Sequence, residues 1–286
     1  MELSAMEFFS GHFSRNAIHL HEPNWDIGGG KISIRDIDEL ARHPEAECVA
    51  ISGLRQDTFE YFIRSYGPQL KAIHFHKDKL VEDWSLLGTL PQLEYVYWFA
   101  NQRIDRLWDM RDNRSLKGLL ISDFSRLHSI EGIERAGALR FFSIGNAIWL
   151  TMVVDSLMPL AETNITDLEF CGKTIQDGNL SFFSSLRNLE SFNCALNLLP
   201  TEQFAWIAAN CPQVEGRALH PKEDGTVYIA RNGEPLEVPG TYIIGKRKPS
   251  LPYEGNEARI QKYVDSFERM KERYRGMPFE EAFPVL

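Results

Sequence analysis

Two histidine pairs come closest, by residue type and spacing, to supporting chemistry in this 286-residue chain. His74-x-His76 and His19-x-His21 each place two imidazoles on one side of an extended strand, a spacing common among metal ligands. Candidates for a third ligand are Asp78 and Asp123. No carboxylate or cysteine follows either pair at a fixed spacing, and paired histidines on a strand are also typical of a hydrogen-bonded surface. A metal-dependent hydrolase is therefore the alternative hypothesis, and we expect neither a metal nor a cofactor.

Other candidate catalytic groups lack the neighbours that their chemistry requires. Cys171 has Lys173 two places on, but no histidine is paired with it to activate a thiolate. Glu131 and Glu134 belong to a charged helical segment and are expected to face solvent. The run Gly28-Gly29-Gly30 is not set in a GxGxxG or GxxxxGK[ST] context, so it predicts a turn. No GxSxG, HExxH or kinase-type motif occurs, and we predict that the chain is not an enzyme.

A hydrophobic triplet, apolar at its first, fourth and sixth places, returns every 23 to 26 residues through the middle of the chain. The copies are Leu70/Ile73/Phe75, Leu93/Val96/Trp98, Leu116/Leu119/Ile121, Leu139/Phe142/Ile144, Ile165/Leu168/Phe170 and Leu189/Phe192/Cys194, preceded by a weaker Ala46/Val49/Ile51. A period of this length indicates a solenoid. Between triplets, residues 57–66 and 201–210 have helical patterns, whereas residues 84–91 suit a 3₁₀ or irregular return.

The triplet resembles the leucine-rich repeat, whose consensus is Leu-x-x-Leu-x-Leu-x-x-Asn/Cys-x-Leu. Residues 189–200 match best and include Asn197, and residues 93–104 place Asn101 at the same ladder position. Four other repeats depart from the consensus there, with Asp78, Phe124, Ala147 and Lys173 at or beside the place of the ladder residue. The resemblance covers about residues 46–216 and implies a parallel sheet on a concave side and a mixed helical convex side. An α/β domain with βα units of similar length is the alternative.

Both flanks are expected to cap the apolar ends of the array. Residues 1–45 have strand-like alternation at Ile18/Leu20 and Ile32/Ile34, then a short amphipathic helix. Residues 217–286 contain Asn232-Gly233, a strong hairpin signal, between two short strands, with a third strand expected at residues 241–244. A helical stripe covers residues 256–275 and is expected to dock on the hairpin or on the last repeat, with partner binding or dimerisation as the alternative. The predicted domains are therefore 1–45, 46–216 and 217–286.

Charge and composition limit the classes of partner. Residues 217–286 hold 12 Lys/Arg and 11 Asp/Glu, a formal charge of +1. Since the whole chain carries −9, residues 1–216 carry −10. An acidic surface repels phosphates, which argues against nucleic acid and favours a basic protein. No signal peptide or membrane-spanning segment is evident, and the four cysteines form no CxxC pair. We expect a cytoplasmic protein, and the sequence does not indicate its oligomeric state.

Strand alternation sends the third, fifth and seventh places of each triplet outward, onto the concave sheet. The predicted partner-binding residues there are His74, His76, Tyr95, Tyr97, Phe99, Leu120, Ser122, Phe141, Asp167 and Glu169. Aromatic residues of this kind are enriched at binding hot spots, and the two carboxylates add an acidic edge. The sequence therefore predicts recognition of another protein, in the manner of an inhibitor or antidote.

Three further hypotheses stay open at this point. A shift of one residue in the rung of Tyr95 would turn Val96 and Trp98 outward instead. Either flank could fold over the aromatic residues and cover them. A substrate adaptor is a further alternative, because Cys211-Pro212 resembles a phrase of adaptor-type leucine-rich repeats, although no F-box-like helices precede the array.

Overall fold

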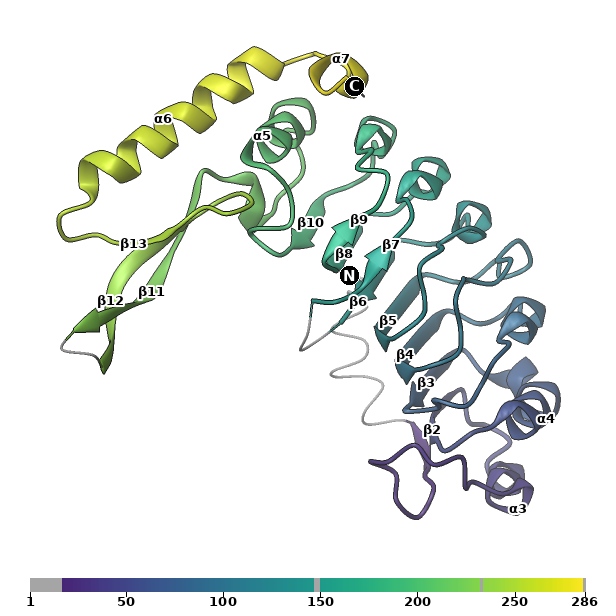
Figure 1. The fold of residues 1–286 in the computed structure, drawn as a ribbon. Helices are drawn as coiled ribbons and strands as arrows, with labels where there is room; N and C mark the ends of the chain where they lie inside the picture. Colours follow the sequence, from purple (N-terminus) through teal and green to yellow (C-terminus); the bar gives the residue numbers. More distant parts are fainter. Residues whose placement is uncertain (1–16, 147–149, 232–233, 285–286) are drawn as a thin grey trace. The chain divides into compact units, whose positions relative to one another are not determined.

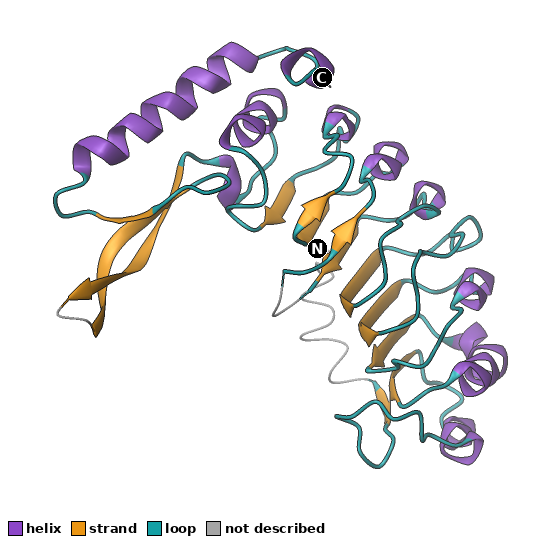
Figure 2. Ribbon diagram, viewed as in Figure 1, coloured by secondary structure: helices purple, strands orange, loops and turns teal. Residues whose placement is uncertain are grey.

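A computed structural model describes residues 17–146, 150–231 and 234–284. The protein is a mixed α/β structure with a large parallel sheet and helices (Figures 1 and 2). The chain divides into two compact units, Met1–Gly178 with Leu186–Asn188, and Asn179–Ser185 with Leu189–Leu286. This division falls inside the predicted repeat array. The boundaries at residues 45 and 216 stay predictions.

The largest sheet has eight strands in the order β1-β2-β3-β4-β5-β6-β8-β10. These are β1 (Ile18–Leu20), β2 (Cys48–Ser52), β3 (Ala72–His76), β4 (Tyr95–Asn101), β5 (Gly118–Phe124), β6 (Phe141–Gly145), β8 (Asp167–Cys171) and β10 (Ser191–Cys194). Neighbours from β1 to β8 pair in parallel. A separate parallel pair consists of β7 (Val153–Val154) and β9 (Thr174–Ile175).

The repeated triplets lie in register on adjacent strands. Phe75 of β3 pairs with Trp98 of β4, which pairs with Ile121 of β5. The fourth and sixth triplet residues from β2 to β8 are at most 1% exposed, so they form the core of the first unit. Val96 and Trp98 are fully buried while their strand neighbours are half-buried, and the hypothesis of a one-residue shift is therefore wrong. Alternation with a period of two explains the register, because every second side chain of a strand reaches the same face.

Short helices return the chain between most neighbouring strands, whereas the return from β4 to β5 contains no helix. In the described part of the first unit, the α-helices are α3 (Ile34–Ile37) and α4 (Gln56–Tyr66), and the 3₁₀ turns are η2 (Asp38–Arg42), η3 (Gly67–Gln69), η4 (Ser85–Thr89), η5 (Ile133–Arg135) and η6 (Met158–Glu162). The helix predicted at residues 57–66 and the 3₁₀ return predicted near residues 84–91 are both confirmed. The α4 helix buries Phe59 and Phe62, because these residues are spaced on one helical face.

A cluster of aromatic rings joins α4 and the returns to the buried face of the sheet. The Phe59 ring lies 5.9 Å from that of Phe75 and 5.8 Å from that of Trp98. Phe124 stands near the predicted ladder position, yet its ring packs 5.4 Å from Trp84. At this rung an apolar side chain fills the interior where the consensus has a polar one, which explains the departure from the pattern.

A left-handed residue recurs at or just after the end of four successive strands, β2 to β5. Gly53, Lys77, Ala100 and Asp123 have φ values between 57° and 82° and each lies two places after the sixth triplet residue. A positive φ costs a non-glycine residue about 1 kcal/mol or more. Only Gly53 of the four adopts this conformation without strain. The conformation therefore recurs because the fold requires it at this position, not because the residue type favours it.

The N-terminal segment differs in part from expectation. Ile18 and Leu20 belong to β1, which pairs with β2, so this strand extends the sheet. The predicted strand at Ile32 and Ile34 is wrong, because Ile34 begins α3. The reason is a capping box, in which Ser33 accepts a hydrogen bond from the Asp36 N–H and the Asp36 carboxylate accepts one from the Ser33 N–H.

The second unit contains a hairpin, a third short strand and three α-helices. Its described elements are η7 (Ser181–Ser184), β10 of the large sheet, α5 (Thr201–Asn210), η8 (Arg217–Leu219), β11 (Lys222–Arg231), β12 (Glu234–Ile243), β13 (Ser250–Pro252), α6 (Glu257–Tyr274) and α7 (Phe279–Ala282). The predicted hairpin and both predicted helices are confirmed. A third strand at residues 241–244 is wrong: residues 241–243 continue β12, and the third strand is β13, after the turn that contains Gly245.

The α6 helix docks within its own unit, as the apolar stripe predicts. Ile260 packs with Ile243 and Leu251, and the Trp206 indole of α5 donates a hydrogen bond of 2.8 Å to the Met277 carbonyl just after α6. The stripe also buries Phe267 and Tyr274. Of the helices that the structure describes, none has the length and apolar character needed to cross a bilayer.

Candidate functional site

The predicted site residues lie on neighbouring strands and on the same face of the sheet. His74 of β3 pairs in register with Tyr97 of β4, and Tyr97 pairs with Leu120 of β5. We call this surface the aromatic face, defined by His74, His76, Tyr95, Tyr97, Phe99, Leu120, Ser122 and Phe141. Leu120 is buried and the others are half-buried. This is the face opposite Phe75 and Trp98, because side chains alternate along a strand.

Ring contacts connect four of these side chains into a continuous surface. The rings of His74 and Tyr97 stack with centroids 4.3 Å apart and planes 9° apart. One step further along the strands, the rings of His76 and Phe99 lie 5.3 Å apart. Tyr95 instead packs against the small residues Cys48, Ala50 and Ala72. The small side chains of β2 thus leave room for the larger rings of β3 and β4.

A loop before the first triplet adds two exposed residues that the sequence pattern did not reveal. The Trp25 ring lies 5.0 Å from that of His76 and 5.9 Å from that of His21, yet Trp25 is 51% exposed. Ile27 of the same loop is 60% exposed. Their only sequence signal is an apolar pair between Pro23 and Gly28, outside the repeats, which carries no periodicity.

The loop is fixed to the sheet by its own polar groups. The buried Glu22 carboxylate accepts hydrogen bonds from the N–H groups of Gly29, at 2.6 Å, and Lys31, at 2.9 Å. The ammonium groups of Lys77 and Lys79 donate to the Asp26 and Ile27 carbonyls at 2.6 and 2.7 Å. The glycine run therefore forms a turn around the Glu22 carboxylate. Its backbone N–H groups donate to Glu22, whereas those of a phosphate-binding loop donate to a bound ligand.

Residues of the N-terminal flank contact the aromatic face and cover part of it, as one of the open hypotheses expected. Trp25 lies against His76, and Ala17 packs beside Tyr95 against Ala50 and Ala72. Any contribution of residues 1–16 falls outside the described part of the chain.

The imidazoles of the face are held neutral. Burial, assisted by the neighbouring imidazoles of His76 and His21, lowers the pKa of His74 to about 3. Burial and the adjacent Lys77 charge lower the pKa of His76, and burial and His19 lower that of His21. At neutral pH the aromatic face thus presents uncharged rings, which suit an apolar group better than an anion.

The predicted acidic edge lies on β8, three strands from β4 and so about 14 Å away. Asp167 accepts a hydrogen bond of 2.8 Å from the Thr166 hydroxyl, and Glu169 accepts one of 2.7 Å from the Ser143 hydroxyl. Both carboxylates are half-buried, and Asp167 pairs in register with Phe141, the residue of the aromatic face on β6. Beside them, burial and the Glu169 charge raise the pKa of Cys171 to about 11, which disfavours a nucleophilic thiolate at neutral pH.

The two histidine pairs lie near each other, since His19 and His21 act electrostatically on His74, but they do not form a metal site in the described part of the chain. Within residues 17–146, 150–231 and 234–284, no group of three or more His, Cys, Asp or Glu side chains could hold a metal ion. The Asp78 carboxylate is fully buried and accepts a hydrogen bond of 2.6 Å from the Leu54 N–H. Burial raises its pKa well above the ordinary value. A raised pKa favours the protonated form of this carboxyl.

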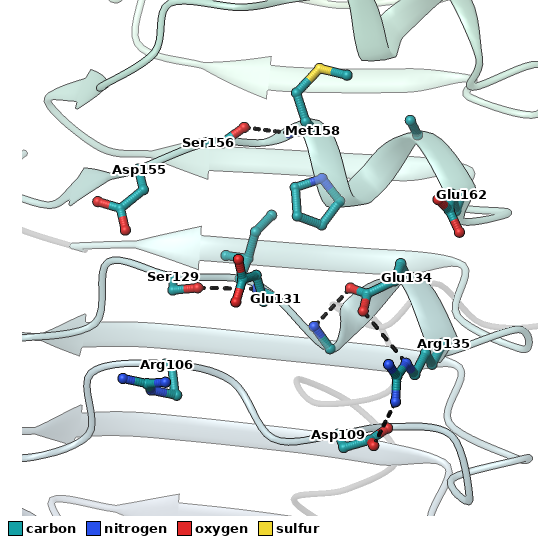
Figure 3. Close-up of a pocket in the computed structure, with 14 residues that line it drawn as sticks. Arg106, Asp109, Ser129, Glu131, Glu134, Arg135, Asp155, Ser156, Met158 and Glu162 are labelled. Atoms are coloured by element: carbon teal, nitrogen blue, oxygen red, sulfur yellow. Dashed lines mark hydrogen bonds and ion pairs between the residues drawn. The ribbon is translucent and has the colours of Figure 1, made fainter.

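A groove of about 830 Å³ runs between the returns η5 and η6 (Figure 3). Several of its charged residues have partners: Arg135 binds Asp109 at 2.8 Å, and Glu134 accepts a hydrogen bond from the Gly132 N–H at 2.7 Å. Asp155 is paired with His128 at 2.7 Å. The groove therefore has the character of a solvated seam between two returns.

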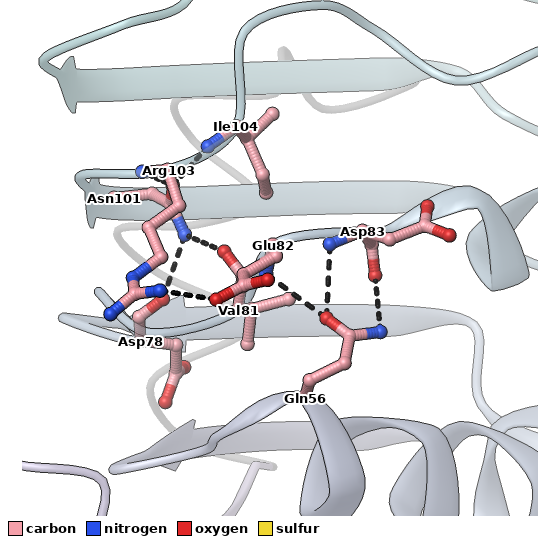
Figure 4. A network of polar contacts seen from close by, with 8 residues as sticks. All are labelled: Gln56, Asp78, Val81, Glu82, Asp83, Asn101, Arg103 and Ile104. Carbon is pink, nitrogen blue, oxygen red and sulfur yellow. Dashed lines mark hydrogen bonds and ion pairs between the residues drawn. The ribbon is translucent and has the colours of Figure 1, made fainter.

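A buried amide fixes the end of β4 and with it the position of Phe99 (Figure 4). The Asn101 amide nitrogen donates to the carbonyls of Asp78, at 2.9 Å, and Val81, at 3.0 Å. Its oxygen accepts from the N–H groups of Arg103 and Ile104, each at 2.8 Å. Asn101 is thus the ladder residue that the sequence predicted.

The return after β4 depends on a second buried amide that sequence reasoning missed. The Asn113 nitrogen donates to the Leu87 and Leu90 carbonyls at 2.8 and 3.0 Å, and its oxygen accepts from the Trp108 indole at 2.8 Å. Its only signal is a polar residue three places before Leu116.

Comparison with known proteins gives no match: the chain matches no protein-family model and no curated protein.

Proposed function

We propose that this chain is a leucine-rich-repeat-like solenoid that binds another protein through its aromatic face. The recurring triplets, their in-register parallel pairing and the ladder amide of Asn101 support the repeat assignment. In such an array each repeat is one turn of a continuous coil, and the strands together form one elongated binding surface.

The observation that carries the proposal is the continuous row of rings from Trp25 through His76 to Phe99, beside the stacked pair of His74 and Tyr97. Rigid rings lose little conformational entropy when a partner binds, so a few of them can supply most of the binding free energy. Their strands are held by backbone ladders on both sides, which keeps the surface formed before the partner arrives.

The partner segment that this surface suits is apolar with flanking basic residues. Neutral imidazoles and aromatic rings would receive the apolar part, and Asp167 and Glu169 would attract the basic part. The formal charge of −10 on residues 1–216 also favours encounter with a positively charged partner. A protein that occludes the active site of a basic enzyme, as an inhibitor does, has this character.

The cysteines favour a reducing compartment. Burial raises the pKa of Cys211 to about 11, and burial also raises that of Cys48, so both behave as small apolar core groups. We therefore propose the cytoplasm as the place of action.

A binding experiment tests the proposal directly. Full-length protein and a variant with Tyr95, Tyr97 and Phe99 all replaced by Ser are compared as baits in the native lysate, and the partner lost by the variant is identified. Tyr97→Ala is then expected to weaken that partner's affinity by about 2 kcal/mol or more, because a central aromatic is removed.

Tyr61→Ala serves as the matched control. Tyr61 is also a half-buried tyrosine, but it lies on α4 and bonds Asp38 at 2.6 Å. An equal affinity for wild type and Tyr97→Ala, with both proteins folded, would refute this use of the aromatic face. Stoichiometric zinc or another transition metal in the purified protein would favour the hydrolase alternative instead.

A further inference from the structure

Among the described residues, the outer edge of the long strand β11 pairs with no other strand. In the three-stranded sheet the order is β11-β12-β13, so β11 is at one edge. The β13 strand pairs only with Gly240, Thr241 and Tyr242 of β12. From Thr226 to the tip the hairpin is therefore a two-stranded ribbon (Figure 1). Ribbons of two strands are marginal in water, whereas three or more strands are stable.

The register settles which backbone groups face the outer edge of β11. Arg231 pairs with Glu234 across two intervening residues, and in such hairpins this closing pair exchanges hydrogen bonds. Counting back by twos, Thr226, Tyr228 and Ala230 direct their N–H and C=O groups away from β12. The Thr226 carbonyl accepts a hydrogen bond of 2.6 Å from the Tyr242 hydroxyl, and its second lone pair can accept another. The same count directs the Pro239 carbonyl outward on β12, and it does accept a hydrogen bond from the Tyr253 N–H at 3.2 Å.

The two edges of the hairpin are protected differently. On β12 the outward positions include Pro235 and Pro239, which lack an N–H and block the addition of a strand. On β11 the outward positions carry no proline, and residues 225–230 have no charged side chain. Natural edges are usually blunted by such residues, so an unprotected β-rich edge indicates a pairing surface.

The exposed side chains on this edge are complementary to a copy of themselves. Tyr228 is 65% exposed. In an antiparallel arrangement centred on Tyr228, the outward groups of two copies come into register: Tyr228 stands opposite Tyr228, and Thr226 stands opposite Ala230. Aromatic pairs directly opposite each other stabilise antiparallel strands, and no like charges meet along this stretch.

We propose that β11 pairs antiparallel with β11 of a second copy of this chain, with the twofold axis at Tyr228. The two hairpins then form one continuous sheet, in which the two-stranded ribbon of each copy becomes part of a four-stranded one. Thr226, Tyr228 and Ala230 exchange backbone hydrogen bonds across the axis. A symmetric pairing of this kind closes after two copies, because it consumes the only unprotected edge of the hairpin.

Sedimentation velocity of the full-length protein over a concentration series tests this pairing. Wild type is expected to dimerise, and Tyr228→Lys to weaken dimerisation at least tenfold, since two ammonium groups would face each other at the axis. Leu236→Lys is the matched control: it places the same charge on an exposed position of β12 and is expected to dimerise like wild type. Circular dichroism of each variant checks that the hairpin unit is folded.

Mixing complementary variants distinguishes self-pairing from other arrangements. Tyr228→Glu is combined with Glu237→Gln, because the Tyr228 hydroxyl bonds Glu237 at 2.7 Å and two adjacent carboxylates would repel. This protein and Tyr228→Lys should each be monomeric alone and form a heterodimer when mixed in equal amounts. A wild type that stays monomeric at high concentration, or a dimer that Tyr228→Lys leaves intact, overturns the proposal.

Discussion

Asn101 and Asp78 stand at equivalent positions of two successive repeats, and both are buried polar side chains. They differ in how completely their hydrogen-bonding groups are satisfied. Asn101 is fully buried and makes four hydrogen bonds, two as donor and two as acceptor. Asp78, 23 residues earlier, is also fully buried, but one carboxylate oxygen accepts from Leu54 and the other has no hydrogen-bond partner among the described residues. An amide can satisfy backbone donors and acceptors together, whereas an ionised carboxylate can only accept.

The difference also has an electrostatic side. Burial raises the pKa of Asp78 well above 3.8, and the nearby Glu22 charge raises it further, against the opposing backbone N–H groups of Leu54 and Gly53. An uncharged amide carries no such cost. The first rungs of the sheet are therefore expected to be pH-sensitive in a way that the Asn101 rung is not.

Asn101→Ala should have the largest effect on this comparison. It leaves the Asp78 and Val81 carbonyls and the Arg103 and Ile104 N–H groups without their partner, and each unsatisfied buried group costs about 1–3 kcal/mol. With some of these groups hydrated, we expect a loss of about 3 kcal/mol or more in the free energy of unfolding, measured by urea denaturation. Asn193→Ala, at an exposed asparagine of β10, is the control. A loss below about 1 kcal/mol would show that the ladder amide is dispensable.

Asp78→Asn should have a smaller effect with the opposite sign. Because the folded-state pKa of Asp78 is raised, the unfolded chain binds fewer protons between pH 3.8 and that value, and stability declines as pH rises through this window. The amide removes this decline and keeps the acceptor for Leu54. We expect a higher free energy of unfolding at pH 7, measured by urea denaturation, because the amide carries no charge that burial would disfavour.

The gain should shrink when the urea titrations are repeated near pH 3.5, where the wild-type carboxyl is already protonated in both states. An identical difference between the two proteins at both pH values would mean that Asp78 is not a neutral acid in the fold.

Ala100→Gly should give the smallest effect, because it changes only the turn before the ladder residue. Ala100 has a φ of 64°, a conformation that costs an L-residue about 1–2 kcal/mol, while glycine adds chain entropy of about 0.5–1 kcal/mol to the unfolded state. A net gain of up to about 1 kcal/mol should appear as a higher melting temperature. Ala208→Gly within α5 is the control and should be destabilising, as glycine is in helix interiors. Equal signs for the two substitutions would contradict the strain at Ala100.

The buried half of the fold was predictable because its signal repeats. Val96 and Trp98 recur in phase with the other triplets, so the pattern sets both strand and register, and Asn101 stands at a fixed offset from them. Trp25 and Asn113 could not be found in this way, since each is used once and has no copy elsewhere in the chain. Their roles depend on which segments the folded backbone brings near them.

The wrong predictions have local causes. At Ile34 the β-branched pattern was outweighed by a two-residue capping box, which supplies hydrogen bonds that a strand there would lack. At residues 241–243 the alternation was real, but the chain continues straight from β12 instead of turning first. The hydrolase alternative is a different case, because it was not the prediction: it arose since ligand spacing is short-range, whereas further ligands depend on tertiary placement.

The constant spacing between each buried strand and its left-handed residue divides the repeat into a part that tolerates length changes and a part that does not. An extra residue between Trp98 and Ala100 would move Asn101 off the carbonyls it holds, and the rungs on either side would lose their alignment. An extra residue in a surface return such as η4 leaves every strand where it was. Lengthening of this protein, by design or by natural drift, is therefore confined to its returns.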